Sequence, residues 1–159
     1  MNAYTELKNR HQEEVDALPL HFAFGDEQIN RKVKELNLSM DPNKRAKQII
    51  SIGCGGFVLK DEYPKVKAVF ERHAIEHWEA IAEDTTGDGY IFAMFDCELA
   101  NHEYGCTGDP TDALAALGIT QKDLEDNTAL MHGFRKACKR QQRWITDEME
   151  DEISDINEY

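Results

Sequence analysis

A segment that begins at Asp84 has the spacing of a calcium-binding loop. Asp84, Thr86 and Asp88 occupy its first, third and fifth positions, and Gly89 occupies the sixth, where such a loop turns sharply. Calcium takes about six to eight oxygen ligands, but the twelfth position, which normally supplies a bidentate Glu, is Phe95. A turn between two helices explains the same residues, because glycines end one helix and an Asp starts the next. The sequence therefore predicts either a calcium site on Asp84, Thr86 and Asp88 or a plain turn between helices.

A second candidate metal site contains two histidines one helical turn apart. His73, Glu76 and His77 follow the order H-x-x-E-H, in which both histidines bind zinc and the Glu acts as the general base of a hydrolase. Glu98 or Glu103 could supply a further ligand. The alternative is that both histidines lie at the edge of the core, on the apolar ridge of a helix, and form ordinary hydrogen bonds.

The cysteines give weaker signals. Cys97, His102 and Cys106 match part of a zinc knuckle but lack its paired cysteines. Cys54 lies in a run of glycines that is compatible with a phosphate-binding loop or a nucleophilic cysteine, but the strand-like residues after it favour a hairpin turn. Because the chain has no C-x-x-C pair, and Cys138 is also isolated, we expect free thiols. No cofactor is predicted.

Negative charge is concentrated in one part of the chain. The sequence has 159 residues and a formal net charge of −13. Residues 1–72 hold 11 acidic and 12 basic residues, whereas residues 73–128, here called the acidic segment, hold thirteen acidic residues and one base, Lys122. Such a segment is suited to a basic protein surface. The residues predicted to bind that partner are Glu76, Glu79, Glu83, Asp84, Asp88, Glu98, Glu103 and Asp109.

The charge changes sign twice toward the C-terminus. Residues 129–145 hold five bases and no acid, and residues 146–159 hold seven acids and no base. These two runs can neutralise each other or the acidic segment, and exposed ion pairs contribute only about 0–1 kcal/mol each. On this interpretation the charges serve solubility, which is the alternative to a binding role.

The charge also excludes classes of partner. DNA, RNA and anionic lipids favour proteins rich in Lys and Arg, so we expect no direct binding to nucleic acid or to a membrane. The residues around Gly118 have the spacing of a helix-turn-helix motif. We do not expect this motif to bind DNA, because the helix after the turn carries Asp123, Glu125 and Asp126, which would repel phosphates. No apolar stretch resembles a signal peptide or a membrane span, which predicts a cytoplasmic location. The oligomeric state is left open.

Most of the elements that position these residues are predicted to be helical. Apolar residues recur at helical spacing over residues 4–18, 26–36, 61–83, 90–99 and from 128 onward. Residues 20–24 suit a short strand, and two β-runs, 49–52 and 57–59, flank a glycine turn. A short helix is expected to be capped by Asp109, with Pro110 at its first position, and to end at Gly118, after which Thr120 with Asp123 opens another turn.

We therefore predict an α+β fold that is predominantly helical. Several amphipathic helices are expected to pack with a small β-hairpin or a short antiparallel sheet. Residues 1–145 are expected to form a single globular domain, and residues 146–159 an acidic C-terminal tail.

Three segments resemble a family of small, acidic, uncharacterised proteins from Firmicutes and their mobile elements. They read LPLHFAFGDEQ over residues 18–28, GCGGFVLK over residues 53–60 and DTTGDGYIFAMFDCELANHEYGCTGDP over residues 84–110. The likeness spans most of the chain. It implies an accessory role linked to a phage or a plasmid, and it carries no activity, cofactor or catalytic residue over to this sequence.

These observations predict a non-enzymatic module that binds a basic protein surface. In its finer form the hypothesis is a nucleic-acid mimic that inhibits a basic host nuclease such as a CRISPR effector, with carboxylates in place of phosphates. The alternative is a metal-binding protein, with a calcium loop at residues 84–95 or a zinc hydrolase at residues 73–77. No residue is assigned a catalytic role.

Overall fold

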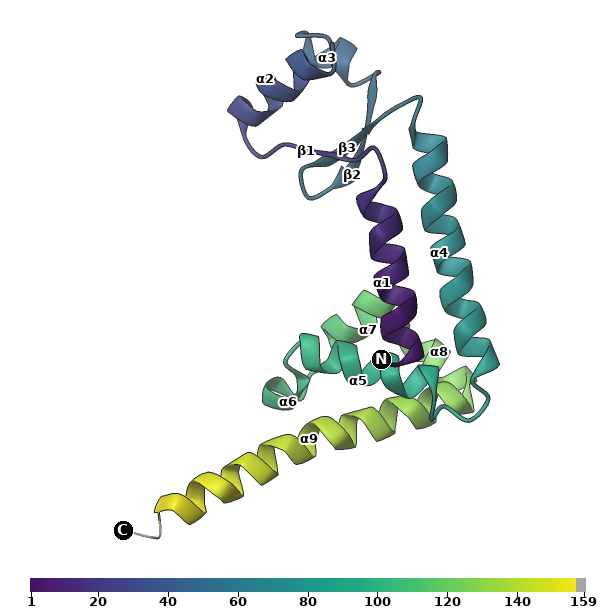
Figure 1. Ribbon diagram of the computed structural model, residues 1–159, viewed down its shortest axis with the longest axis vertical. Coiled ribbons are helices and arrows are strands. Elements are labelled where there is room, and N and C mark those ends of the chain that lie inside the picture. Colours follow the sequence, from purple (N-terminus) through teal and green to yellow (C-terminus); the bar gives the residue numbers. More distant parts are fainter. Residues whose placement is uncertain (157–159) are drawn as a thin grey trace. The chain divides into compact units, whose positions relative to one another are not determined.

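The fold is predominantly helical with one small antiparallel sheet, which confirms the predicted α+β class (Figure 1). This computed structural model describes the backbone of residues 1–156 and the side chains of residues 1–142. Its contacts divide the chain into two compact units. We call residues 11–75 the sheet unit, and residues 1–10 together with those from Glu76 onward the helical unit. The single domain expected over residues 1–145 stays a prediction.

Along the described part of the chain the helices are interrupted twice by strands, first by β1 and then by the pair β2 and β3. Their bounds are α1 Ala3–Asp16, β1 His21–Phe22, α2 Asp26–Glu35, α3 Pro42–Arg45, β2 Ile49–Gly53, β3 Gly56–Leu59, α4 Tyr63–Glu83, α5 Tyr90–Asn101, α6 Tyr104–Thr107, α7 Thr111–Leu117, α8 Gln121–Asp126 and α9 Thr128–Ile156. None of the helices in the described part of the chain is long and apolar enough to cross a membrane.

The sheet unit is built on the predicted hairpin. Strand β3 lies in the middle of the order β1-β3-β2, and both of its neighbours are antiparallel to it. The turn between β2 and β3 uses positive φ at Cys54 (48°) and Gly55 (74°), a backbone conformation that glycine adopts most readily. Because a strand follows this turn and no helix starts there, the geometry is that of a hairpin and differs from that of a phosphate-binding loop.

Most helix boundaries agree with the sequence signals. Pro64 lies in the first turn of α4, Gly118 ends α7 in the left-handed conformation, and Thr120 with Asp123 forms a capping box. Pro110 occupies the N-cap of α7, one position before the expected one. The single-turn helices α3 and α6 were not predicted, because four residues are too few to show a helical period.

Helix α9 continues to Ile156 and so enters the segment expected to be an acidic tail. Residues 157–159 and the side chains from residue 143 onward lie outside the described part of the structure. The expected tail is therefore described here only as the backbone of a helix.

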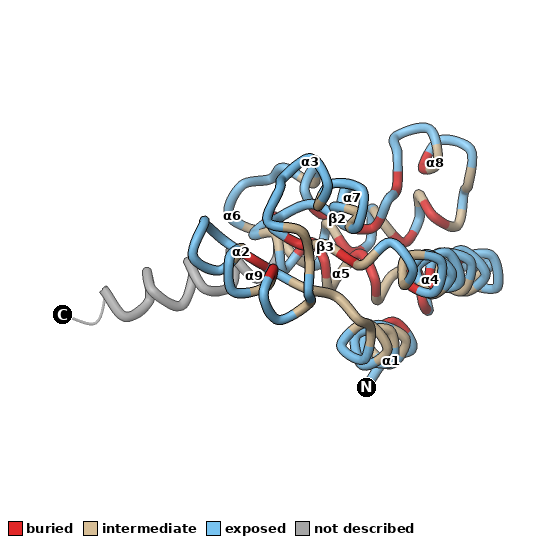
Figure 2. The backbone as a smooth tube through the Cα atoms, turned by 90° about the horizontal axis from the view of Figure 1, so that it is seen from above, coloured by how far each residue is buried: buried red, intermediate tan, exposed pale blue. Residues whose placement is uncertain are grey.

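Helix α5 forms the centre of the core of the helical unit. It contacts α6, α7 and α9, and Ile91, Met94, Phe95 and Leu99 on this helix are completely buried. Figure 2 shows buried backbone segments at α5, and others at α8 and near β3. The hydrophobic face of α5 is therefore wide, as expected for a helix that is covered on several sides.

A close approach of backbones joins α9 to the start of α5. A Cβ atom at Gly133 would lie 2.6 Å from the carbonyl oxygen of Gly87 and 2.6 Å from Cγ2 of Ile91. Both distances are shorter than any ordinary contact, and one of the two atoms belongs to the backbone. Only glycine fits at this point of α9, although glycine is a poor helix former.

We predict that Gly133→Ala destabilises the fold, although alanine normally favours a helix interior by about 1 kcal/mol. The added methyl group must push α9 away from Gly87 and Ile91, and overpacking of this kind costs about 1–3 kcal/mol. Urea unfolding measures the difference. Gly108→Ala is the control, because a Cβ there meets nothing within 4 Å and only the positive φ of 68° opposes it. A Gly133→Ala variant as stable as wild type would contradict this packing.

Candidate functional site

In the predicted calcium loop, backbone groups occupy the oxygens of Asp84. Oδ1 accepts hydrogen bonds from the N–H of Gly87 at 2.9 Å and from the hydroxyl of Thr86 at 3.0 Å. Oδ2 accepts from the N–H of Gly89 at 3.0 Å and of Ile91 at 2.9 Å. Burial opposes the charge on Asp84, but these hydrogen bonds outweigh it and lower its pKa. The carboxylate therefore holds the turn before α5 and satisfies N–H groups at the start of that helix.

The second carboxylate of the loop faces α9. Oδ1 of Asp88 lies 2.6 Å from Nζ of Lys136 and 3.0 Å from Nε2 of His132, and these two contacts lower the pKa of Asp88. No group of three or more His, Cys, Asp or Glu side chains that could hold a metal ion occurs among the described residues. The arrangement matches the turn interpretation, and the calcium interpretation stays a prediction without geometric support.

The histidines of the H-x-x-E-H motif have separate partners. In the sheet unit, Nε2 of His73 lies 2.6 Å from Oε2 of Glu14, and the ring of His73 stacks on that of His11 at 3.8 Å. In the helical unit, Nδ1 of His77 lies 2.8 Å from the hydroxyl of Tyr90. These contacts fit the interpretation of both histidines as core-edge residues.

The Glu of the motif also has a partner of its own, since Nη2 of Arg10 donates to Oε2 of Glu76 at 2.8 Å. The three side chains of the incomplete zinc knuckle also have separate surroundings. Cys106 is an exposed free thiol, Cys97 accepts a weak hydrogen bond from Asn101, and His102 lies 3.8 Å from Oε2 of Glu98. The zinc hypotheses therefore gain no support from the geometry.

Glu98 is buried, although the sequence placed it on the partner-binding surface. Its side chain is 6% exposed and accepts hydrogen bonds from the hydroxyl of Tyr4 at 2.6 Å, from Nδ2 of Asn101 at 3.3 Å and from the ammonium of Lys8. Burial raises its pKa, but the hydrogen bonds from Lys8, Tyr4 and Asn101 together hold that pKa below its usual range. Glu98 thus anchors the first turns of α1 on α5 and is not available to a partner.

The remaining carboxylates of the acidic segment divide into two groups. Asp96 and Asp126 form ion pairs with Arg140 and Lys122, as Glu76 and Asp88 do with Arg10 and Lys136. A second group forms no ion pair with any described residue: Glu79, Glu83, Glu103, Asp109, Asp112, Asp123 and Glu125. Of these, Asp109 and Asp123 accept hydrogen bonds from Thr111 and Thr120. Half of the eight predicted contact residues, namely Glu79, Glu83, Glu103 and Asp109, therefore remain exposed and without a cation.

The outer face of the last turns of α4 combines two of these carboxylates with an exposed tryptophan. Trp78, Glu79, Ala82 and Glu83 are all exposed, and Trp78 is 41% exposed. Their spacing of one, four and five residues places them on one side of the helix. We call these four residues the α4 face. Trp78 is not among the contact residues predicted from the sequence, because it lies three residues from Ile81, close to the apolar ridge, and the helical period gives no sign that it is exposed.

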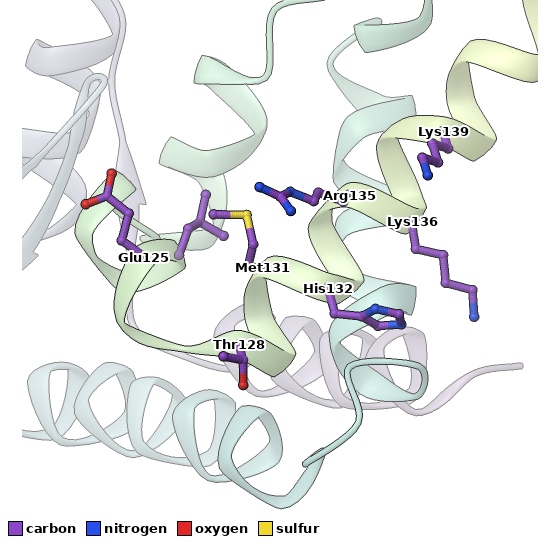
Figure 3. A pocket seen from close by; sticks show the side chains of 8 residues that line it. Glu125, Thr128, Met131, His132, Arg135, Lys136 and Lys139 are labelled. Atoms are coloured by element: carbon purple, nitrogen blue, oxygen red, sulfur yellow. The ribbon is translucent and has the colours of Figure 1, made fainter.

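In contrast to the acidic α4 face, a groove lined by residues of α8 and α9 is rich in basic side chains. It has a volume of about 540 Å³; Met131 and the buried Leu124 give its lining an apolar part, and Arg135 and Lys139 are among its basic residues (Figure 3). We call it the α8–α9 groove. The net charge of the chain did not indicate this groove, because a total charge does not show where the less numerous basic residues cluster on the surface.

Comparison with known proteins places the chain in a family. Residues 3–140 match the profile of a family of unknown function, DUF7659, and the chain belongs to that family. This agrees with the resemblance to an uncharacterised family. Searches among curated proteins and among solved structures gave no match.

We predict that Asp84→Ala destabilises the protein by about 1–3 kcal/mol, because it leaves backbone N–H groups before α5 without an acceptor. Asp88→Ala, at the exposed carboxylate of the same loop, should have a smaller effect. Thermal unfolding with and without calcium checks both statements, and added calcium should leave the melting temperature of the wild type unchanged. If calcium raises the melting temperature of the wild type and either substitution abolishes this rise, the calcium-site interpretation would be supported.

We predict that Lys8→Met lowers stability at neutral pH by about 1–3 kcal/mol, because the charge on buried Glu98 loses its cation. Since folding lowers the pKa of Glu98, its contribution is present above the unfolded pKa of about 4.3 and is lost as the pH falls through the folded pKa. The gap between wild type and Lys8→Met should therefore narrow on acidification. Urea unfolding at neutral and at acidic pH measures it.

The matched control for this prediction is Lys122→Met, which removes one partner of an exposed pair, with Asp126. Its effect should stay within about 0.5 kcal/mol. Equal losses for the two lysine variants, or a gap that does not change with pH, would show that Glu98 does not depend on Lys8.

Proposed function

We propose that this member of a family of unknown function is a non-enzymatic module that binds a basic protein surface through the α4 face. The observation that carries the proposal is the pair Glu79 and Glu83 beside exposed Trp78, with no ion pair to either carboxylate among the described residues. Acidic and aromatic groups together suit a partner that presents Lys or Arg around an apolar contact.

The two glutamates do not stabilise their own helix. They lie four residues apart, a spacing at which like charges destabilise a helix by roughly 0.2–0.5 kcal/mol. They also lie near the C-terminal end of α4, where the helix dipole is negative and the last turn holds no base. Residues that oppose the stability of their helix and lack a counter-ion are explained more readily by a binding role than by the fold.

Trp78 supplies the apolar part of the contact. Tryptophan is enriched among the residues that dominate protein interfaces, because it buries a large area and loses little conformational entropy. Ala82, one turn further along α4, is small and exposed as well. Glu79 and Glu83 border this apolar surface, so a basic partner could bury Trp78 while pairing with both carboxylates.

The other unpaired carboxylates add a longer-range effect. Glu103, Asp109, Asp112 and Glu125 are exposed in the same helical unit and carry no cation among the described residues. Their field attracts a basic partner during the encounter and is screened beyond a Debye length of about 8 Å at physiological salt. The association rate should therefore depend strongly on salt, and the dissociation rate mainly on contacts at the α4 face.

The finer form of the proposal is an inhibitor encoded by a mobile element and active in the cytoplasm. Its target would be a basic nuclease, such as a CRISPR effector, whose nucleic-acid site is blocked by the carboxylates. This form rests on the net charge of −12 of the acidic segment and on the expected resemblance to small proteins from Firmicutes and their mobile elements.

The test compares a charge-neutral variant with a matched control. Glu79→Gln/Glu83→Gln removes two charges from the α4 face, and Glu6→Gln/Glu13→Gln removes two from exposed positions on α1. In affinity purification at low ionic strength from the organism that encodes it, the first variant should lose most of a basic partner that wild type and control retain. Loss of two interfacial pairs of about 1 kcal/mol each weakens binding roughly 30-fold.

Three outcomes would contradict the proposal: retention of the partner by the Glu79→Gln/Glu83→Gln variant, equal loss in the control, or a partner that is acidic. For the finer form, the protein should displace a labelled oligonucleotide from the isolated partner, and the displacement should fall as salt increases. A partner that binds protein and oligonucleotide together would exclude nucleic-acid mimicry.

A further inference from the structure

Two basic residues of the α8–α9 groove have no acidic partner among the described residues. Lys136 and His132 contact Asp88, and Arg140 contacts Asp96. Arg135 and Lys139, in contrast, form no ion pair with any described side chain, and both are exposed. They lie four residues apart on α9, so their charges repel each other. The groove therefore presents a local positive charge on a chain whose net charge is −13.

The shape and lining of the groove favour an amphipathic occupant. Its apolar lining comes from half-buried Met131 of α9 and from Leu124 of α8, which is itself buried in the core, and Arg135 and Lys139 project from α9 near Met131 (Figure 3). A groove with an apolar lining and a charged edge is the kind of surface that receives the apolar side of a helix of opposite charge. The complementary occupant is an acidic helix with regularly spaced apolar residues.

The chain itself contains such a sequence at its C-terminal end. Residues 146–159 hold seven acidic residues and no base, and from Ile145 onward the apolar residues Met149, Ile153 and Ile156 follow at spacings of four, four and three. This is the sequence period of an amphipathic helix. Six of the seven acidic residues fall between positions 147 and 155.

The acidic C-terminal residues 146–159 of the same copy cannot reach the groove. Helix α9 is continuous from Thr128 to Ile156, and with a rise of about 1.5 Å per residue position 147 lies about 12 Å along the axis from Lys139. Side chains on one helix pair only when they are three or four residues apart. The sequence allowed residues 146–159 to neutralise the basic run 129–145 of the same chain. For Arg135 and Lys139 the continuous helix prevents this pairing.

We propose that the α8–α9 groove binds the acidic C-terminal segment of a second copy of this chain, in an antiparallel homodimer. A two-fold axis near residue 143 places positions 147–155 of one α9 opposite positions 131–139 of the other. The same contact then forms twice, as in any isologous dimer. The basic run of each copy meets the acidic run of its partner, and the two charge blocks of α9 have a common explanation.

A second copy fits the groove better than nucleic acid does. The acidic segment of the chain carries a net charge of −12 and would repel a phosphate backbone as it approached the groove. Glu125 also lines the groove and adds a further negative charge there. The C-terminal segment of a second copy is acidic as well, but its apolar residues, spaced three and four apart, can cover the half-buried side chain of Met131, which a phosphate backbone cannot do.

The first experiment measures self-association of the full chain by sedimentation equilibrium. The wild type should dimerise at low ionic strength, and higher salt should weaken the dimer. Arg135→Gln/Lys139→Gln should weaken it roughly tenfold or more, because each substitution acts twice in a symmetric dimer. Lys44→Gln/Lys47→Gln is the control: it removes the same charge from exposed residues of the sheet unit and should leave the dimer unchanged.

A charge exchange separates this arrangement from other dimers. Arg135→Glu/Lys139→Glu makes the groove acidic, and Glu150→Lys/Asp151→Lys/Glu152→Lys makes the C-terminal segment basic. Three consecutive positions are chosen because they cover three directions around a helix. Each variant alone should be monomeric, since like charges then meet at both contacts. An equimolar mixture should form a heterodimer, because both contacts regain opposite charges.

Several results would overturn the proposal. One is a wild-type chain that stays monomeric at high protein concentration and low salt; another is a dimer that the groove variant leaves intact. Failure of the two charge-exchanged variants to associate, while circular dichroism shows both to be folded, would also exclude this pairing. Saturable binding of a labelled single-stranded oligonucleotide that depends on Arg135 and Lys139 would identify nucleic acid as the occupant instead.

Discussion

The contact between α5 and α9 is the constraint on which the rest of the helical unit depends. Gly133 lets α9 approach Gly87 and Ile91 so closely that no other side chain fits. This approach buries the apolar face of α5 and sets the rotation of α9 against it. The rotation in turn decides which basic residues of α9 meet α5, because side chains four residues apart share a face. Packing therefore determines how the charges of the unit are distributed.

The distribution of charge follows directly from that packing. Lys136 and Arg140 lie on the side of α9 that meets α5, and they pair with Asp88 and Asp96. Arg135 and Lys139 lie away from these carboxylates and border the α8–α9 groove. A chain with a large net negative charge thus keeps a local positive surface. The two proposed contact surfaces have opposite sign, and both lie within the helical unit.

Buried and capping carboxylates show why a count of acids overstates the available surface. Glu98 is enclosed by Tyr4, Lys8 and Asn101, and Asp84 holds the turn before α5. Both are charged, but neither can meet a partner. The proposed function depends mainly on Glu79 and Glu83, which form no ion pair with a described residue, reduce the stability of α4 and lie beside Trp78.

Much of the local structure could be predicted from the sequence by itself, because local structure depends on neighbours in the chain. Apolar spacing identified the long helices, Gly118 and Thr120 marked helix ends, and the glycine turn at Cys54 indicated the hairpin. The sequence also determined the total charge and its blocks. Single-turn helices and the pairing of β1 with β3 were not predictable, since four-residue helices have no measurable period and strand pairing joins residues far apart.

Only the tertiary structure decided which charged groups are buried, paired or exposed. Glu98 and Glu79 look alike in sequence, yet one accepts a hydrogen bond from Tyr4, 94 positions away, and the other faces solvent. Likewise, the sequence does not distinguish Lys136 from Arg135. In the folded chain Lys136 pairs with Asp88, just before α5, whereas Arg135 has no acidic partner among the described residues. The environment of a charge depends on atoms that folding brings near it, and the order of residues along the chain does not encode those distances directly.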